Sequence, residues 1–330
     1  MKKPFSHKRW TPRLLNLLVW TCLATGLLGL LMRYGVRDRV PMLAAFFYAL
    51  PPLIIVMLFA TSMGLSLLAP RRRRRTQMLG LLTIIAIGVW VQTDFVWAKA
   101  SDDAAPSFRV ALWNLARPSG TDTSFIPALQ EADAQILFLA ESGGQTIDRQ
   151  RFWESHFPDH YVRLFAGQMT LLSRFPIAST RCTAVGEGSW IAECDLVLPG
   201  ETLSVVAVDV VSFPCNGRKR PLGRIGAIAG AKRHPTLVLG DFNTPHTSVL
   251  FEEFRRSFSH AFEESGRGLI TTWPYFLPVL TLDHIWLSEG LVPVRTTLGR
   301  TRHSDHAIVM CDIAVEGFRQ PVEPGAVGDA

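Results

Sequence analysis

The segment from Leu237 to Asn243 carries the side chains of this sequence that are best spaced for chemistry. Its apolar residues predict a buried strand, and Gly240 is expected to let the chain turn where that strand ends. Asp241 and Asn243 follow two positions apart, so on an extended chain they point the same way into one site. A carboxylate can activate water and an amide can hold a phosphate oxygen. The same two residues can equally cap a turn.

Polar side chains also end other predicted strands between residues 108 and 310. Strands are predicted over 108–114, 136–140, 190–198 and 203–209, and helices over 125–132 and 221–231. The polar residues at predicted strand ends are Asn114, Glu141, Asp209, Asp241 and Asp305. Active sites gather at the ends of buried strands in layered α/β domains. Five such positions in one region favour a catalytic site.

The N-terminal third differs in composition from the rest of the chain. Residues 1–100 contain 14 Lys/Arg and 2 Asp/Glu, whereas residues 101–330 contain 20 Lys/Arg and 26 Asp/Glu. The positive charge of the whole chain therefore comes from its N-terminal third, and the remainder is an acidic region large enough to have its own core. Non-specific nucleic-acid binding depends on Lys and Arg contacts with phosphates, so an acidic domain argues against it.

Three largely apolar stretches predict a helical transmembrane anchor over residues 1–99. They cover about residues 14–32, 40–69 and 77–97, and roughly 20 apolar residues are needed to span hydrocarbon. Pro51 and Pro52 predict a kink in the second stretch. Cationic residues precede the first stretch, and Arg71–Arg75 separate the second from the third. This distribution predicts a multi-pass protein of the cytoplasmic (inner) membrane, with a cytoplasmic N-terminus and a periplasmic C-terminal domain.

The other boundaries follow from composition. Residues 100–107 are expected to form a linker, residues 108–316 the catalytic domain and residues 317–330 a tail. Cys182 and Cys194 lie symmetrically about Gly188, so a hairpin could place them opposite each other. They could form a disulfide in an oxidising compartment or remain free thiols.

The motifs of the C-terminal region, taken in chain order, resemble the endonuclease/exonuclease/phosphatase superfamily. They are Asn114, Leu139-Ala140-Glu141, Leu172-Ser173-Arg174-Phe175-Pro176-Ile177, Gly240-Asp241-Phe242-Asn243, Thr272-Trp273-Pro274, Leu282-Asp283-His284-Ile285 and Ser304-Asp305-His306. The resemblance covers about residues 108–315. It implies an α/β fold, a four-layer sandwich of two packed mixed sheets flanked by helices, here preceded by the helical anchor. It also implies a metal-dependent phosphoric ester hydrolase.

This resemblance implies a role for each site residue. Glu141, Asn114 and Asp305 are expected to hold the metal, with Mg²⁺ as the cofactor and Mn²⁺ as a possible substitute. Asp241 would orient or deprotonate the attacking water, and Asn243 would donate to a phosphate oxygen. His306 would contact the scissile phosphate, oriented by Asp283. Arg224 is a candidate for substrate binding, whereas His246, His284 and His303 are expected to be packing or surface residues.

One position departs from the pattern of the family. Many members have a second catalytic histidine at the strand end that Asp209 occupies in this chain. A carboxyl group cannot donate a proton near neutral pH unless its pKa is raised. Asp209 therefore binds metal or positions water, or the site works with one histidine, or activity is impaired. We favour an active enzyme with altered specificity, because the other site motifs are present.

Three functions remain open at this point. The favoured one is a phosphoesterase that acts outside the cytoplasmic membrane on a lipid or lipid-linked head group, because the anchor would hold the site near the bilayer. The second is a membrane-tethered extracytoplasmic nuclease, for which Arg218-Lys219-Arg220 and Arg224 could form a basic rim. The third is a catalytically silent module that binds phosphate-bearing ligands or protein partners.

Overall fold

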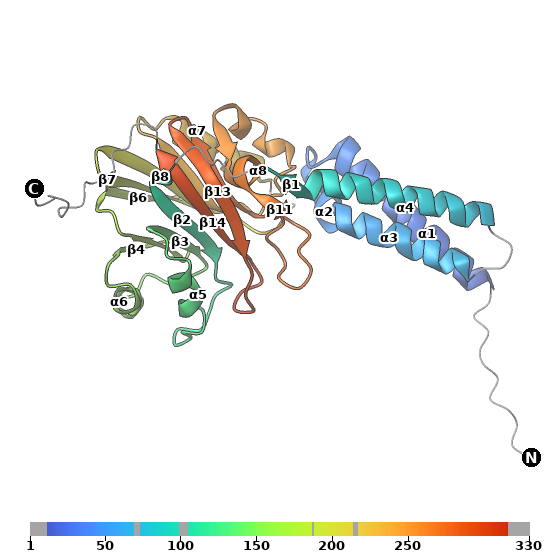
Figure 1. Cartoon of the computed structure of the whole chain (residues 1–330), viewed down its shortest axis with the longest axis horizontal. Coiled ribbons are helices and arrows are strands. Elements are labelled where there is room, and N and C mark those ends of the chain that lie inside the picture. Colours follow the sequence, from blue (N-terminus) through green and yellow to red (C-terminus); the bar gives the residue numbers. More distant parts are fainter. Residues whose placement is uncertain (1–11, 69–72, 99–104, 187, 214–216, 316–330) are drawn as a thin grey trace, which may run out of the picture. The chain divides into compact units, whose positions relative to one another are not determined.

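The computed structural model of the protein describes residues 12–68, 73–98, 105–186, 188–213 and 217–315. The chain divides into two compact units, with the boundary between Phe95 and Val96 (Figure 1). The predicted tail, most of the predicted linker and two of the five arginines of Arg71–Arg75 lie outside the described residues.

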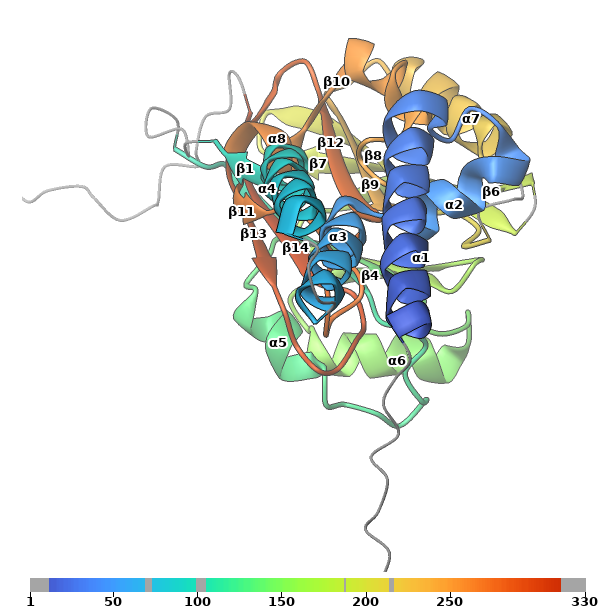
Figure 2. The same ribbon diagram turned by 90° about the vertical axis from the view of Figure 1, so that its right-hand side faces the viewer.

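The first unit is helical. Its elements are α1 (Pro12–Leu30), which continues as the π-helix η1 (Leu31–Val36), α2 (Pro41–Ala49), α3 (Pro52–Leu67) and α4 (Arg73–Asp94). Helix α3 packs against both α1 and α4 (Figure 2). Gly26 of α1 permits this packing, because a Cβ atom there would come within 2.5 Å of the Phe59 ring.

Two helical segments of this unit, Arg13–Val36 and Arg73–Asp94, are long and apolar enough to cross a membrane. The stretch predicted as one span over residues 40–69 instead forms α2 and α3, which are bent by 60° relative to each other. Pro51 and Pro52 lie at this break. They cause it, because proline lacks the N–H that would continue the hydrogen bonding of a helix. The predicted kink is thus a break between two helices.

The second unit contains two six-stranded sheets. The first has the order β13-β14-β2-β3-β5-β4, with β2 (Phe108–Asn114), β3 (Ile136–Ala140), β4 (Tyr161–Phe165), β5 (Met169–Ser173), β13 (Leu291–Gly299) and β14 (Ile308–Val315). The second has the order β10-β12-β9-β8-β7-β6, with β6 (Ile177–Gly186), β7 (Ser189–Leu198), β8 (Glu201–Asp209), β9 (Thr236–Asp241), β10 (Phe258–His260) and β12 (Asp283–Ser288).

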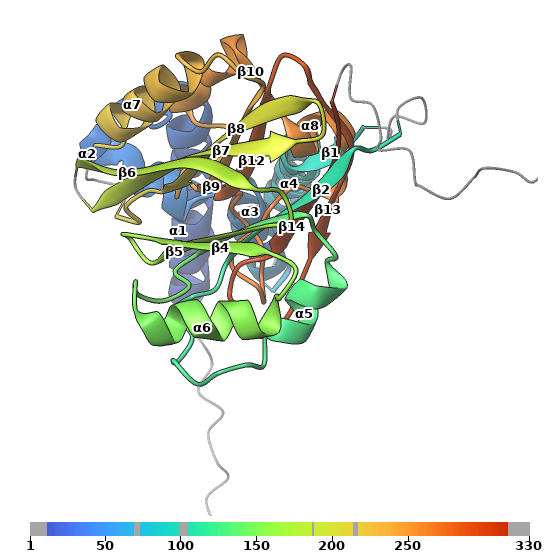
Figure 3. The same cartoon turned by 90° about the vertical axis from the view of Figure 1, so that its left-hand side faces the viewer.

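The remaining elements are short strands and helices. They are β1 (Phe95–Trp97), β11 (Arg267–Leu269), α5 (Ile126–Glu131), α6 (Ile147–His156), α7 (Lys219–Gly230), α8 (Ala261–Ser265) and the 3₁₀ helices η2 (Val249–Phe251) and η3 (Phe254–Arg256). Figure 3 shows α5 and α6 beyond one side of the paired sheets and α7 beyond the other.

Three apolar clusters hold these layers together. The inner faces of the two sheets share a core that includes Val110, Phe138, Leu171, Val205 and Leu239. The outer face of the first sheet packs on α5 and α6 through a cluster that includes Trp113 and Trp153. The outer face of the second sheet packs on α7 through Val206, Leu222 and Ile225, among others. The predicted four-layer α/β sandwich is confirmed.

Strand direction brings the polar strand ends to one edge of the sandwich. β2 runs parallel to β3, and β8 runs parallel to β9, so the ends of neighbouring strands coincide. Asp305 was predicted to end a strand, but it precedes β14. Because β14 is antiparallel to β2, the start of β14 lies at the edge where β2 ends. Asp305 therefore reaches the predicted edge from a loop.

Gly240 has a different role from the one predicted, because the strand continues through it. It pairs with Val208 and His284 inside the sheet at φ +148°, and a Cβ atom at this position would lie 1.9 Å from the Val208 carbonyl oxygen. Glycine is needed here for close approach of two backbones.

We expect Gly240→Ala to destabilise the second unit by about 3–5 kcal/mol, since the clash is with backbone and cannot relax through a rotamer change. Gly223→Ala is the matched control, because Gly223 lies in α7 with open space around it. That change should stabilise by about 0.5–1 kcal/mol. Chemical denaturation of both variants compares the two effects, and equal stabilities would contradict this role of Gly240.

The hairpin that carries Cys182 and Cys194 is present as β6 and β7. Its register places Ala192 opposite Cys182 and Thr180 opposite Cys194, so the two cysteines are offset from each other. Every cysteine among the described residues is a free thiol. The sequence left open a disulfide or two free thiols, and in the structure Cys182 and Cys194 are free thiols.

Candidate active site

Asp241 lies at the centre of the site, where the two sheets meet. Its side chain is buried at the end of β9. Asn114, at the end of β2 in the other sheet, donates a 2.9 Å hydrogen bond from Nδ2 to Asp241 Oδ2. The backbone N–H of Asn243 donates to Asp241 Oδ1 at 2.8 Å. Both carboxylate oxygens are thereby fixed in orientation.

Asn243 reaches this site by a turn. The predicted strand alternation does not extend to it, because β9 ends at Asp241 and Asn243 has a left-handed backbone with φ 47°. Its Nδ2 donates to the Val210 carbonyl at 2.8 Å, which ties the loop after β9 to the loop after β8. The second Nδ2 hydrogen remains available for a ligand oxygen.

Asp283 and His306 complete a buried cluster with Asp241. Asp283 starts β12 directly opposite Asp241 in the ladder, and its Oδ2 lies 2.8 Å from His306 Nδ1. Asp241, Asp283 and His306 each offer one potential ligand atom, and these three atoms lie within 4.8 Å of one another. The predicted contact between Asp283 and His306 is present, so Asp283 fixes the orientation of the imidazole ring.

The loop that carries His306 is fastened to β2. Ser304 Oγ donates to the Asn114 carbonyl at 2.6 Å and accepts the His306 backbone N–H at 3.0 Å. Trp113 Nε1 donates to the His306 carbonyl at 3.0 Å. The motif Ser304-Asp305-His306 thus has a physical basis, since its serine places the histidine.

The remaining predicted site residues lie around this cluster at different exposures. Asp209 ends β8 beside Asp241 in the parallel ladder. Glu141 directly follows β3, and its Oε1 forms an ion pair with Nη2 of Arg117 at 2.9 Å. Asp305 is exposed and accepts a 2.8 Å hydrogen bond from Trp273 Nε1. Arg224 lies on the exposed side of α7, and its role in substrate binding stays a prediction.

The ionisable groups of the site have strongly shifted pKa values. Burial, together with the charges of Asp241 and Glu141, raises the pKa of Asp209 to about 8. Burial and the charge of Asp283 raise the pKa of Asp241 to about 7. Burial lowers the pKa of His306, but Asp283, Asp241 and Asp305 outweigh it and raise that pKa to about 10. His306 is therefore a cation at neutral pH.

These residues fit a bound divalent cation. The expected ligands are Glu141, Asn114 and Asp305. In addition, Asp283 Oδ1 is buried and makes no hydrogen bond within the described structure, so the site offers one more hard oxygen donor. Burial is the main cause of the raised pKa values of Asp209 and Asp241, neighbouring carboxylates add to it, and a bound cation would act in the opposite direction. Carboxylate and amide oxygens are the ligands that Mg²⁺ and Mn²⁺ prefer.

Backbone strain coincides with the site. Of the non-glycine residues with positive φ in the described chain, four border it: Ala116, Arg117, Glu141 and Asn243, with φ between 47° and 56°. Each such conformation costs about 1–3 kcal/mol and persists where the surroundings enforce it. The loops after β2, β3 and β9 are therefore held in place by the fold.

A histidine pair behind the site supports the loop after β9. His284 Nε2 lies 2.8 Å from the Thr244 carbonyl, and His284 Nδ1 lies 2.9 Å from His260 Nε2. Because the carbonyl can only accept, His284 Nε2 carries a proton, and His260 Nε2 donates to His284 Nδ1. His284 was expected to be a packing or surface residue; it is buried, and it also positions the loop. This positioning role depends on the contacts of His284 with Thr244 and His260, which a sequence does not show.

We expect the histidine pair to make stability fall in acid. Burial lowers the pKa of both His260 and His284 well below the usual value, so both remain neutral in the fold. Nearby Arg255 and His246 act in the same direction on His260. The pair contributes fully above the unfolded pKa of about 6.5, and stability falls by about 1.4 kcal/mol per pH unit per histidine below it.

Thermal unfolding between pH 7 and pH 5 measures this decline. His260→Gln keeps a neutral hydrogen-bonding side chain and should show a shallower decline. If wild type and variant decline in parallel, the histidine pair is not the cause.

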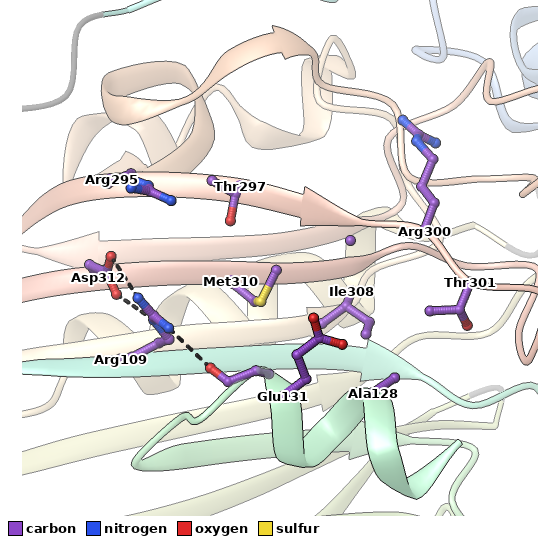
Figure 4. A pocket seen from close by; sticks show the side chains of 12 residues that line it. Arg109, Ala128, Glu131, Arg295, Thr297, Arg300, Thr301, Ile308, Met310 and Asp312 are labelled. Atoms are coloured by element: carbon purple, nitrogen blue, oxygen red, sulfur yellow. Dashed lines mark hydrogen bonds and ion pairs between the residues drawn. The ribbon is translucent and has the colours of Figure 1, made fainter. Parts of the chain in front are cut away.

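A separate cavity of about 360 Å³ lies elsewhere on the second unit and shares no residue with the site. It lies between α5 and strands β13 and β14, and Figure 4 shows Arg109 bound to Asp312 within it. That ion pair, with a shortest distance of 2.6 Å, neutralises Arg109. Because none of the residues that line this cavity belongs to the site motifs, we place the chemistry at the strand ends.

The fold and the site define the class of the protein, a hydrolase of the phosphoesterase and nuclease type. Residues 111–306 match the model of the Endonuclease/Exonuclease/phosphatase family. This match covers more than half of the chain, and the chain belongs to that family. No curated protein sequence matches the chain.

Several solved structures share the fold. An endonuclease/exonuclease/phosphatase family protein from Bacteroides thetaiotaomicron has 16% identity and a TM-score of 0.53, covering 63% of this chain and 98% of its own. A mannosyl-6-phosphatase from the same species has 15% identity and a TM-score of 0.51, covering 63% and 100%. TDP2 from D. rerio, complexed with single-stranded DNA product, has 12% identity and a TM-score of 0.51, covering 63% and 98%. At these identities the likeness shows the fold alone.

Proposed function

We propose that the protein hydrolyses a phosphate ester with the help of a bound divalent cation, Mg²⁺ or Mn²⁺. The observation that carries this proposal is the buried cluster of Asp241, Asp283 and His306, joined to Asn114 of the facing sheet. The cation would be held by Glu141, Asn114 and Asp305, with Asp209 as a further oxygen donor or a holder of water. When bound, it would lower the negative charge of the phosphate and of the site.

The side chains of this chain then divide the work. Asp241 would accept a proton from the attacking water, whose oxygen forms the new bond to phosphorus. Asn243 would donate from Nδ2 to a non-bridging phosphate oxygen as charge builds there. His306, kept cationic by Asp283, would hold another oxygen and supply a proton to the departing ester oxygen. Water adds to phosphorus, the ester bond breaks, and the alcohol leaves with a proton.

We also propose that the enzyme is anchored in the cytoplasmic membrane with its catalytic unit outside the cytoplasm. Arg13–Val36 and Arg73–Asp94 support the anchor by their length and apolar composition. The positive charges before the first helix and between α3 and α4 support the orientation. An alkaline-phosphatase fusion placed after Lys99 should be active in cells, and an inactive fusion would contradict this orientation.

An exposed aromatic loop at the site favours a lipid or lipid-linked substrate. Thr272 and Trp273 anchor the loop: Thr272 accepts the Asp283 backbone N–H at 3.3 Å, and Trp273 binds Asp305. The Leu280 backbone N–H closes the loop on the Trp273 carbonyl at 2.9 Å. Between these points Tyr275 and Phe276 are 41% and 82% exposed. Large exposed apolar side chains beside a site match a substrate that has an apolar part.

The test uses the full chain reconstituted in phospholipid vesicles, with Asp241→Asn as its control. We would supply Mg²⁺ or Mn²⁺ with phospholipids, polyprenyl phosphates or plasmid DNA and follow products by phosphorus NMR and gel electrophoresis. We expect metal-dependent lipid turnover and intact DNA. DNA nicking without lipid turnover would replace the proposal with a tethered nuclease, and silence on all substrates would favour a ligand-binding module.

Phe276→Ser separates the lipid proposal from the chemistry. We expect this variant to raise KM for vesicle-borne substrate about tenfold and to leave turnover of a short, water-soluble phosphate ester unchanged. Equal effects on both substrates, or on neither, would contradict a role of this loop in lipid recognition.

A further inference from the structure

Arg117 is a charged residue of the site that the roles above leave out. Its Nη2 lies 2.9 Å from Glu141 Oε1. Its side chain is 69% exposed, compared with 22% for Glu141. The guanidinium therefore covers the expected metal ligand from the solvent side.

The backbone of Arg117 is held tightly. Ala116 and Arg117 both have left-handed φ angles, 53° and 56°. The Ala116 N–H donates to Asn114 Oδ1 at 2.9 Å, and the Arg117 N–H donates to the Glu141 carbonyl at 3.1 Å. Neighbouring non-glycine residues adopt this conformation only where the fold enforces it. The loop thus fixes the point from which the arginine side chain extends.

The guanidinium itself is held loosely. Glu141 is its single ion-pair partner among the described residues, and an ion pair this exposed contributes little to stability. Arginine presents five N–H donors in a planar fork that matches phosphate oxygens. Within the described part of the chain, only Nη2 of the Arg117 side chain has a hydrogen-bond partner, so the other donors are free for a ligand.

We propose that Arg117 binds the phosphate group of the substrate and occupies Glu141 only until a cation takes its place. In the metal-free chain the guanidinium neutralises Glu141. When Glu141 holds a cation, the arginine is released from its carboxylate partner and turns to the non-bridging oxygens of the phosphate. This inference rests on the proposed phosphoesterase function and adds a substrate-binding residue to it.

Because Arg117 is expected to bind both Glu141 and phosphate, its removal should change two measured affinities in opposite directions. In the full chain in detergent, Arg117→Ala should tighten Mn²⁺ binding about threefold, because the competing guanidinium is gone. The same variant should weaken binding of inorganic phosphate to the Mn²⁺-loaded protein about tenfold. Electron paramagnetic resonance measures free Mn²⁺, and calorimetry measures phosphate binding.

Two further variants complete the experiment. Arg117→Lys keeps the charge but not the fork, so it should restore wild-type Mn²⁺ affinity and recover phosphate affinity only in part. Arg174→Ala removes another exposed arginine, which pairs with Asp133 at the opposite end of β3. It should change neither reading.

The outcomes separate this inference from the proposed function. Wild-type protein that binds Mn²⁺ and phosphate, with an Arg117→Ala variant unchanged within twofold in both, would overturn the Arg117 inference alone. Wild-type protein that binds neither would overturn the proposed function as well.

Discussion

Replacing Asp241 with asparagine is expected to lower phosphate-ester turnover by about 10³-fold, within the range for loss of a general base. Asparagine matches aspartate in size, and its carbonyl oxygen can still accept from one of the two donors, Asn114 Nδ2 or the Asn243 N–H, while the other loses its acceptor. It cannot accept a proton from water. Steady-state turnover of any accepted substrate, compared with wild type, measures the effect.

The same variant should not be less stable than wild type. The pKa of Asp241 is raised to about 7, mainly by burial, so its carboxyl destabilises the fold increasingly as pH rises from its ordinary value towards 7. Asparagine removes that cost at the loss of one of the two hydrogen bonds that the carboxylate accepts, which is worth about 1–3 kcal/mol. Metal-free Asp241→Asn protein should therefore melt at a higher temperature than wild type at pH 8. An inactive variant that also melts much lower would show unfolding as the cause of its inactivity.

His306→Ala is expected to lower turnover by about 10²–10⁴-fold, because it removes both a cation that faces the phosphate and a proton donor. Asp283→Asn should have a smaller effect in the same direction, since the ring remains but loses the partner that orients it. Turnover of the two single variants and the double variant measures their dependence on each other. Losses that simply multiply would contradict a functional His306–Asp283 pair.

The pair also predicts a pH dependence for the metal-free chain. Asp283 holds the pKa of His306 near 10 against the opposing effect of burial. This stabilisation is fully present below the unfolded pKa of about 6.5 and is lost as pH rises through about 10. Thermal unfolding with a chelator present should show this alkaline decline in wild type, and His306→Gln should lack it.

The sequence predicted the parts of the molecule that local pattern determines. Apolar runs predicted β2 and β3 with their observed bounds. The motifs around Asp241 and His306 predicted the residues that meet in the buried cluster. Both predictions succeed because hydrophobic periodicity and residue type are properties of neighbouring residues in the sequence.

The rest depended on partners distant in the chain. The role of Gly240 depends on the carbonyl of Val208 in the neighbouring strand, and Asp305 reaches its place because β14 runs antiparallel to β2. Arg117 lies between the predicted strand 108–114 and the predicted helix 125–132, where the sequence showed no pattern, and only its contact with Glu141 draws attention to it. Likewise, the size of the bend between α2 and α3 could not be predicted, because two adjacent prolines indicate a break in a helix but not its angle.

The most direct test of the central claim is phosphate-ester turnover by the full chain before and after removal of bound metal. Turnover should disappear with a chelator and return on addition of Mg²⁺ or Mn²⁺, because the carboxylates at the strand ends would hold the cation that the reaction needs. Turnover that continues unchanged in the metal-stripped protein would contradict a metal-dependent phosphoesterase site at Asp241, Asp283 and His306.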